Sequence, residues 1–542
     1  MILPPIIPVI LLILGALAVA ASDLARLRRP SLVMIVTAIG ALLVMFTLRS
    51  DTPLTQIISA WQPVSVFTVP ISFRVDRTAW ILGLGFIVAG LSAAFTWAAY
   101  PGRDRPGPRA VSLLLLATAI ASVFASNLLT LALTWGLFDL VFVAAVLLRS
   151  GPQLGRRAAT AIVLNATSTV CVWIATLLIE NAHDSLYWHL IDLAAGPAGW
   201  LAAAAVLRLG VYPLHQWLPI ELEQGPDRAA LLFSIPPAVG LALWARLALT
   251  QNLPPTSIVP QLAIISAMVG GVLAWQSSPA PRSWSYIALS LASLAVVQVG
   301  SVGAQGPSGM LTVAALNFLF MVVSLFIARS FTWRAPWWSA SAIVAGLSIA
   351  GVPGTLGFIV RQQTLVGLTQ SNNWLWLVGC VLAETLLIAA VLRTGFTPQD
   401  AAPPTGVLRR ISFGLGLATS ALPLIALPLV AGWLPLVPSL STLFGRMTGI
   451  SWLAWLAPIV LGVLLAWRAP RLAASAPETA GSTPIWVSVL RLDWLNAALS
   501  FLMQRLTTVL RGLASVIEGE GGLIWAIIII IVGLVLNTGV FK

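Results

Sequence analysis

The sequence predicts an all-α polytopic membrane protein, and both its composition and its apolar runs support this class. Of its 542 residues, 59% are hydrophobic and 8% are charged, whereas soluble domains carry about 25% charged residues. Apolar runs of about 18 to 24 residues recur along the chain, and each is long enough for one helix across a bilayer. A soluble enzyme is therefore excluded, and so is a transmembrane β-barrel, whose strands have roughly ten residues of alternating polarity.

Charged and Pro/Gly-rich stretches divide the chain into about sixteen apolar segments, and each of these is predicted to be a transmembrane helix. The segments cover residues 2–21, 31–48, 79–99, 110–126, 128–148, 159–180, 197–218, 229–249, 258–275, 283–300, 309–329, 337–360, 373–395, 411–435, 452–467 and 521–540. The first segment lacks the basic n-region of a signal peptide, so we expect an uncleaved first helix.

The basic residues predict the orientation of these segments. If the segments alternate in direction, the odd-numbered loops carry about three times as many basic residues as the even-numbered loops. By the positive-inside rule the odd loops are cytoplasmic and both termini lie outside. The net charge of +12 then reflects topology and contact with lipid headgroups, so nucleic acid is not an expected partner.

The Ala/Arg-rich composition and the lack of a transit peptide favour the bacterial plasma (inner) membrane.

Two stretches outside the apolar segments have structure of their own. Residues 49–78 contain β-branched and aromatic alternation around Val64 to Phe73, which predicts a hairpin on the outer surface. Residues 468–520 begin as a polar linker and continue as an amphipathic helix. Its apolar positions recur at helical spacing: Leu492, Leu495, Leu499, Leu502, Leu506, Val509 and Leu513. This helix is either an interfacial helix that leads to the last span or a lateral strut that contacts a neighbouring subunit.

Four ionisable residues lie inside predicted spans or directly at the end of one. Asp139, Arg208 and Glu384 lie within spans, and Arg361 directly follows the twelfth segment. Charges in a bilayer are costly, so each one is a candidate for an ion path. The alternative is that they form structural ion pairs within the bundle.

Helix-breaking residues lie beside two of these charges. Pro213 follows Arg208, and a second group precedes Arg361, consisting of Gly351, Pro353, Gly354 and Gly357. Broken helices at matching places indicate an ion path in transporters built from repeats, because unwound backbone can line a wet cavity. The alternative is a pair of kinks that packing tolerates.

Three stretches resemble a known family. They are NLLTLALTWGLFDL (127–140), RLGVYPLHQWLP (208–219) followed by GPDRAALL (225–232), and GVPGTLGFIVRQ (351–362). They are similar to the fifth, seventh to eighth and twelfth helices of the antiporter-like membrane subunits. These subunits occur in respiratory complex I (NADH:quinone oxidoreductase), Mrp-type cation/proton antiporters and membrane-bound hydrogenases.

The resemblance implies fourteen core helices, an outward N-terminus and two inverted five-helix repeats with broken helices. The expected blocks are three spans with the outer hairpin (1–109), the first repeat (110–249), the second repeat (258–396), two further spans (411–467), a linker with an amphipathic lateral helix (468–520) and a final span (521–542).

The resemblance also implies which residues would carry protons, and several positions depart from the family pattern. The family pairs a glutamate with a lysine in its first half-channel; here Gly136 occupies the glutamate position, with Asp139 three residues later, and Arg208 occupies the lysine position. Arg361 aligns with the terminal residue of the path. The central histidine aligns with Phe233 or Ser234, and Phe318 and Val322 replace ionisable residues. Since arginine keeps its proton under almost all conditions, the relay is altered.

The leading hypothesis is an antiporter-like membrane subunit of an assembly related to complex I or Mrp. Its ancestral role would be proton or cation translocation coupled to partner subunits. The alternatives are a non-conducting structural scaffold subunit and a self-contained secondary ion transporter. We expect lipid and other membrane subunits as partners. If transport persists, Asp139 and Arg208 would form the first charged pair, and Arg361 and Glu384 would flank the exit.

We expect no redox cofactor and no catalytic site of the chain's own, because iron–sulfur cysteine spacing and a haem-ligand pair are both absent from the sequence. Cys171 and Cys380 lie in separate apolar runs, which indicates neither a disulfide nor a metal site. His215, beside Pro213, is a further candidate for the ion path, although a structural hydrogen bond is its more ordinary role.

Overall fold

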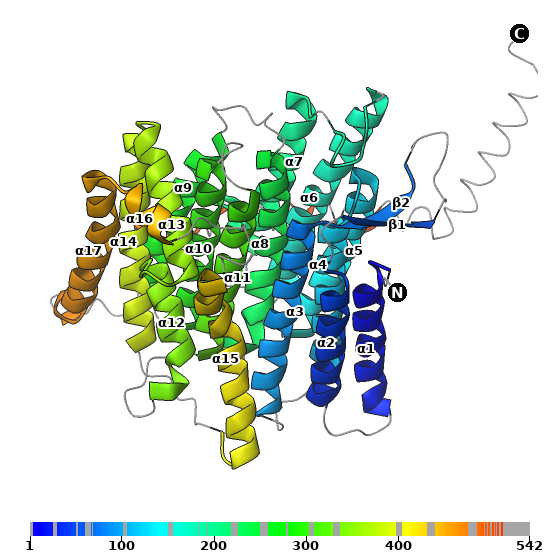
Figure 1. The fold of residues 1–542 in the computed structure, drawn as a ribbon, viewed down its shortest axis with the longest axis horizontal. Helices are drawn as coiled ribbons and strands as arrows, with labels where there is room; N and C mark the ends of the chain where they lie inside the picture. The colour runs from blue at the N-terminus through cyan, green and yellow to red at the C-terminus, as the bar shows by residue number, and fades with distance from the viewer. Residues whose placement is uncertain are drawn as a thin grey trace, which may run out of the picture. The chain divides into compact units, whose positions relative to one another are not determined.

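A computed structural model shows long helices lying side by side, with a short hairpin at the edge of the bundle (Figure 1). The structure describes residues 4–24, 30–49, 53–59, 67, 69–100, 106–149, 155–182, 184–191, 193–217, 226–249, 258–277, 280–302, 308–328, 336–396, 404–430, 440–474, 485–492, 494–495, 497–498, 501–502, 504–505, 507–508 and 511–512. The chain divides into two units, residues 1–482 and 483–542.

The first unit is built almost entirely from helices. In order, its elements are α1 (Ile7–Leu24), α2 (Pro30–Thr47), β1 (Leu54–Ser59), β2 (Ile71–Val75), α3 (Arg77–Ala98), α4 (Pro106–Phe124), α5 (Leu128–Arg149), α6 (Gly155–Asn181), α7 (Ala195–Leu209), η3 (Leu214–Trp217), α8 (Pro226–Leu249), α9 (Ile258–Gln276), α10 (Ala280–Val302), α11 (Ser308–Ala328), η4 (Pro336–Trp338), α12 (Ala340–Ile349), α13 (Leu356–Gln370), α14 (Trp374–Phe396), α15 (Val407–Val430), α16 (Leu440–Gly445) and α17 (Gly449–Ala474).

Among the described residues, twelve helices are long and apolar enough to cross a membrane. Three shorter apolar helices, Ile7–Ser22, Ala195–Leu209 and Ala340–Ile349, lie where the sequence also predicts spans. The all-α polytopic fold is therefore confirmed. The predicted last span, residues 521–540, lies outside the described residues, so the count of sixteen crossings stays a prediction.

The predicted twelfth segment, residues 337–360, is two helices separated by a turn. α12 ends at Ile349 and α13 begins at Leu356. Gly351 and Gly354 have φ angles of 64° and 90°, a left-handed backbone conformation that glycine adopts without a steric penalty. The hydroxyl of Thr355 then accepts a hydrogen bond from the Phe358 backbone N–H and so caps α13. The break was predicted from the sequence. The predicted segment ends at residue 360, however, whereas α13 continues to Gln370.

The region of the predicted outer hairpin contains two antiparallel strands, β1 and β2. Leu54 pairs with Val75 and Gln56 pairs with Phe73, so the first strand lies earlier in the chain than the alternation around Val64 suggested. The strand β2 is fastened to the start of α5, because the Asn127 side chain donates to the Pro70 carbonyl at 2.9 Å.

α11 lies at the centre of the first unit. Its apolar stretch Met310–Ala328 is wholly buried. The helix contacts α3, α8, α10, α13 and α15. The series α4 to α8 and α9 to α14 follow each other in the chain, and each contains an interrupted helix. The division into two five-helix repeats stays a prediction. The inverted relation of these repeats stays a prediction.

The second unit contains α18 (Ile485–Arg491). Leu492, the first position of the predicted amphipathic helix, has a φ angle of 57°, so α18 ends there. The described residues from 494 to 512 are helical, and Trp494, Phe501 and Leu502 are exposed. Several positions of the predicted apolar face lie outside the described residues, and its contact with a partner remains a prediction.

Candidate functional site

Asp139 of α5 and Arg208 of α7 form a buried ion pair. The Arg208 Nη1 and Asp139 Oδ1 atoms are 2.6 Å apart. The hydroxyl of Thr169, from α6, donates a hydrogen bond to the other carboxylate oxygen of Asp139. Arg208 is completely buried. Three helices therefore contribute to one neutralised charge pair inside the bundle.

Aromatic rings complete the surroundings of Arg208. Its guanidinium carbon lies 4.3 Å from the Trp135 ring centroid and 4.8 Å from that of Phe138, within the range of cation–π attraction. The indole N–H of Trp135 donates to the Ser168 hydroxyl at 3.0 Å. Ser168 in turn donates to the Ala204 carbonyl of α7 at 2.9 Å. The chain of contacts fixes α5, α6 and α7 around the guanidinium.

The helix break after Arg208 explains why the charge lies where it does. α7 ends at Leu209, and the next residue, Gly210, has a φ angle of 67°. The Trp217 indole N–H donates to the Leu207 carbonyl at 3.0 Å. Arg208 thus occupies the last helical turn, where the negative end of the helix dipole favours a cation. Pro213 lies in the turn that follows, after a cis peptide bond from Tyr212.

His215 lies in η3, directly after this break, and is buried. Its ring stacks on that of Tyr212 at 5.3 Å, and the ring of Tyr286 is 6.4 Å away. The described ring contacts of His215 are thus with two tyrosines.

Arg361 of α13 and Glu384 of α14 form the second buried ion pair. The Arg361 Nη2 and Glu384 Oε2 atoms are 2.6 Å apart. Arg361 also donates to two backbone carbonyls: from Nη1 to Ala350 at 2.6 Å and from Nη2 to Trp455 at 3.0 Å. Arg361 therefore has more acceptors than Arg208.

The break before Arg361 requires glycine at position 357. A Cβ atom there would overlap the Ser348 carbonyl oxygen. The close approach lets the Gly357 N–H donate to the Ser348 hydroxyl at 3.0 Å, and that hydroxyl donates to the Asn317 side chain at 2.8 Å. The two half-helices α12 and α13 are thereby joined to each other and to the central helix α11. Pro353 lies within the connecting turn.

The centre of the bundle has no titratable side chain at the positions where the family carries them. Phe233, Ser234, Phe318 and Val322 are all completely buried on α8 and α11. In place of charged groups there are buried polar atoms that lack a hydrogen-bond partner among the described residues. They are the hydroxyls of Ser234, Thr312 and Ser324 and the side-chain amide of Gln362. Buried polar atoms of this kind are commonly satisfied by internal water.

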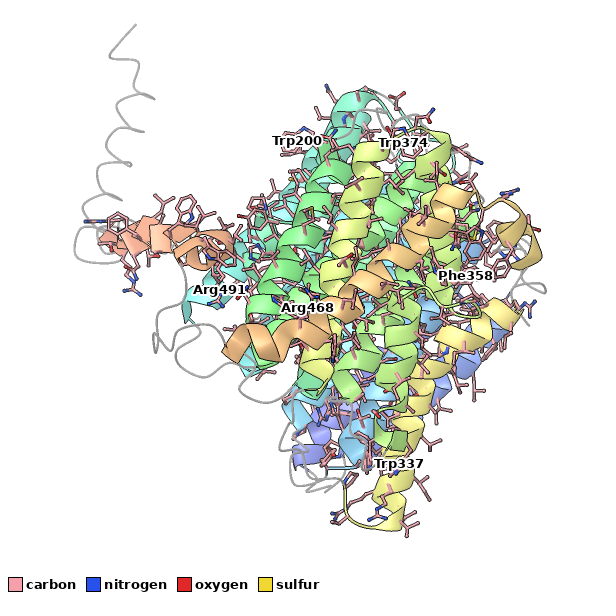
Figure 2. All side chains as sticks on the ribbon, turned by 90° about the vertical axis from the view of Figure 1, so that its left-hand side faces the viewer. Trp200, Trp337, Phe358, Trp374, Arg468 and Arg491 are labelled. Carbon is pink, nitrogen blue, oxygen red and sulfur yellow. The ribbon has the colours of Figure 1, made fainter. Side chains whose placement is uncertain are left out.

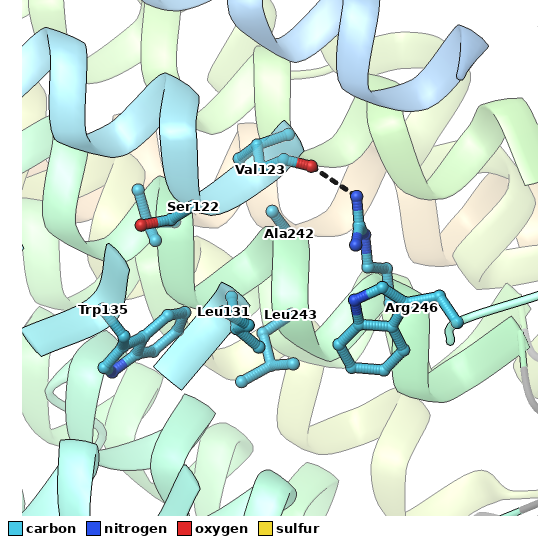
Figure 3. Close-up of a pocket in the computed structure, with 9 residues that line it drawn as sticks. Ser122, Val123, Leu131, Trp135, Ala242, Leu243 and Arg246 are labelled. Atoms are coloured by element: carbon cyan, nitrogen blue, oxygen red, sulfur yellow. Dashed lines mark hydrogen bonds between the residues drawn. The ribbon is translucent and has the colours of Figure 1, made fainter. Parts of the chain in front are cut away.

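A small cavity lies between α4, α5 and α8 (Figure 3). Its volume is about 10 Å³, which is room for roughly one water molecule. Trp135 lines one side and Arg246 of α8 the other. Arg246 donates to the carbonyls of Val123 and Ala125. No sequence pattern marks Arg246 for this role, because its acceptors are backbone carbonyls more than 100 residues earlier in the chain.

No group of three or more metal-ligating side chains occurs among the residues that the structure describes. Cys171 and Cys380 are buried and unbonded to each other.

By fold and site, this chain is a multi-spanning membrane protein in which two broken helices each carry a buried arginine paired with an acid. Residues 125–387 match the family model described as the transmembrane domain of NADH:quinone oxidoreductase and Mrp antiporter subunits. In this region the chain is similar to the antiporter-like membrane subunits of that family.

Individual relatives agree with this similarity. NADH-quinone oxidoreductase subunit N of Laribacter hongkongensis is 23% identical over 60% of this chain and 75% of its own length. The subunit N of Chromohalobacter salexigens is 28% identical over 38% of this chain and 50% of its own length.

Two solved structures share the fold. A chain of the Mrp complex from a Dietzia species superposes with a TM-score of 0.70 at 18% identity, covering 98% of this chain and 63% of that chain. A chain of an archaeal membrane-bound sulfane sulfur reductase has a TM-score of 0.69 at 15% identity, covering 98% and 99% of the two chains.

Proposed function

We propose that this chain is an antiporter-like membrane subunit of an assembly related to complex I or Mrp, and that it takes part in proton or cation translocation coupled to partner subunits. The observation that carries the proposal is the pair of buried arginine–acid contacts, one at each broken helix. Burial of charges in a bundle is expensive, and broken helices beside them are the usual means of admitting ions and water to a transport route.

Within each pair, the acid is the group that exchanges a proton. Arginine stays protonated, so Arg208 and Arg361 act as fixed positive charges that hold Asp139 and Glu384. A proton that arrives at either carboxylate weakens the ion pair, and its departure restores it. The two arginines therefore control the acids without carrying protons themselves.

Between the pairs, bound water is the proposed carrier. The unpartnered hydroxyls of Ser234 and Ser324 and the amide of Gln362 provide donors and acceptors where ionisable residues are missing. Such polar groups orient water without binding protons tightly. The relay thus differs in chemistry from one built on lysine and histidine.

The kinds of relatives favour a subunit over a self-contained transporter. The named relatives are subunits of NADH-quinone oxidoreductase, and the fold occurs in chains of multi-subunit Mrp and sulfane sulfur reductase complexes. Membrane subunits of such an assembly are thus the proposed partners. We place the chain in the bacterial inner membrane on the strength of its Ala/Arg-rich composition. The loop charges favour an N-terminus on the outside.

The test is proton movement into vesicles that hold the native complex. Asp139→Asn and Glu384→Gln keep each side chain's shape but abolish proton binding, and each is expected to lower flux at least about tenfold. Asp184→Asn changes an exposed acid and serves as the matched control, with native flux expected. If both buried variants pump at the native rate, the proposed route is wrong and a non-conducting scaffold is the better explanation.

A further inference from the structure

A helix that lies after the family-matched residues 125–387 contacts the second ion pair. α16 and α17 follow residue 387, where the family match ends. α17 packs along α14, and both α16 and α17 contact α13. Figure 2 looks onto the face that α17 crosses, with Arg468 toward one end of this helix and Phe358 of α13 toward the other.

α17 supplies acceptors for the guanidinium of Arg361. The Nη2 group donates to the Trp455 carbonyl at 3.0 Å and approaches the Ala454 carbonyl at 3.5 Å. Ala454 lies four residues before Pro458. Proline has no backbone N–H, so the Ala454 carbonyl lacks the donor that a regular helix provides. The proline thus leaves an acceptor free at the point where a buried cation needs one.

The Trp455 side chain holds the turn on the other side of the same guanidinium. Its indole N–H donates to the Gly351 carbonyl at 2.7 Å. Gly351 directly follows Ala350, whose carbonyl accepts from Arg361 Nη1 at 2.6 Å. One residue of α17 therefore fixes both the helix break and the arginine bound to it.

Aromatic rings extend this contact over the start of α13. The ring centroids of Phe358 and Phe444 are 5.2 Å apart, those of Phe444 and Trp452 are 5.9 Å apart, and those of Trp452 and Trp455 are 5.7 Å apart. Leu443, next to Phe444, is buried in a cluster with Phe358 and residues of α11 and α13. The leucine anchors α16 in the bundle.

We infer that α16 and α17 form a clamp over the second ion pair. Trp455 positions the guanidinium of Arg361, and the cluster of Phe358, Phe444, Trp452 and Trp455 keeps water away from Arg361 and Glu384. Movement of a proton between this pair and the adjacent water then requires the clamp to open. Both helices of the clamp lie after residue 387, where the family match ends. Trp455 is the residue that positions the Arg361 guanidinium.

The inference rests on the proposed function only for its consequence, because access to the ion pair is measurable without any transport. Cys380 is buried on α14, four residues and about one helical turn before Glu384, so its thiol reports whether reagent reaches the pair. Cys171 is also buried, on α6, and reports general loosening of the fold.

The experiment measures the labelling rates of the two native cysteines. The full chain is treated with a negatively charged methanethiosulfonate reagent, and the two cysteine peptides are quantified by mass spectrometry. Trp455→Ala is expected to raise the Cys380 rate about tenfold while the Cys171 rate stays native, because local opening exposes only the nearby thiol. Trp467→Ala, which removes an exposed indole from the same helix, is the matched control and leaves both rates native.

Two milder variants guard against simple misfolding. Trp455→Phe removes the hydrogen bond to Gly351 but keeps an aromatic ring, and Pro458→Ala gives the Ala454 carbonyl a competing helical donor. Both are expected to raise the Cys380 rate a few-fold with Cys171 unchanged. The clamp is refuted if Cys380 keeps its native rate in Trp455→Ala and in both milder variants, or if the two cysteines speed up together in every variant.

The function and the clamp fail in different ways. If Asp139→Asn and Glu384→Gln lose flux while the clamp variants keep the native Cys380 labelling rate, the proposed route is supported and the clamp is refuted. If the clamp variants label faster at Cys380 alone while both acid variants keep native flux, the clamp is supported and the proposed route is refuted.

Discussion

At the residue scale, the two ion pairs show how one type of cation is held in two ways. Arg361 has two well-formed bonds to carbonyls besides its acid. Arg208 has one acid and two aromatic faces. Aromatic faces attract a cation without accepting directed hydrogen bonds, so Arg208 depends more strongly on its carboxylate.

This dependence predicts the stability of Asp139 variants. Asp139→Leu leaves Arg208 buried without a counter-charge and is expected to cost roughly 3–5 kcal/mol. The double variant Asp139→Leu/Arg208→Met removes both charges and is expected to recover most of that loss. Thermal unfolding in detergent measures the difference, and a double variant no more stable than the single one would contradict this account.

Gly357 gives a second prediction at this scale. Gly357→Ala places a methyl group against the Ser348 carbonyl oxygen, so we expect the break between α12 and α13 to be forced apart and folded yield to fall sharply. Gly346 lies in α12, and a methyl group added there would have nothing within 4 Å. Gly346→Ala is therefore the control, and it is expected to stabilise the chain by up to about 1 kcal/mol. Equal yields of the two variants would show that the close approach is not required.

At the element scale, the start of α5 joins the hairpin to the bundle. Asn127 caps α5, since its side-chain oxygen accepts from the Thr130 N–H at 2.8 Å. Its amide group donates to Pro70 and Ser72. One side chain thus fixes a helix start and a strand together.

Asn127→Ala removes all three of these bonds and leaves buried partners unsatisfied. We expect a loss of about 2 kcal/mol in the free energy of unfolding, within the range for a cap and for unsatisfied buried groups. Asn373→Ala, at an exposed position, is the matched control with little expected effect. Chemical unfolding followed by tryptophan fluorescence distinguishes the two.

The helix breaks show what can be predicted for an element. Proline and glycine act locally, so Pro213 and the glycines before Arg361 identified the interrupted helices from the sequence. The extension of α13 to Gln370, and the place of β1 at Leu54, depend on packing partners and were not predicted. Several carbonyl acceptors of the arginines were missed for the same reason, because Ala350, Trp455 and Val123 carry no side-chain signal.

At the scale of the whole molecule, orientation is the property to be tested. The loop charges place the loop after α6 outside and the start of α15 inside. Asp184→Cys and Arg409→Cys lie at exposed positions of these two regions. In a chain with Cys171→Ala and Cys380→Ala, a membrane-impermeant maleimide applied to intact cells is expected to label only the first. The reverse pattern would invert the topology.

The membrane class, the places of the broken helices and the four charges inside the bundle could all be predicted from the amino-acid sequence. These properties follow from hydrophobicity, proline and glycine, which act within one segment of the chain. What each charge touches became known only from the packed helices: Thr169 and the aromatic faces at the first pair, and the carbonyls of α17 at the second. Those contacts depend on which helix faces pack together, and that is settled by the shapes of residues far apart in sequence.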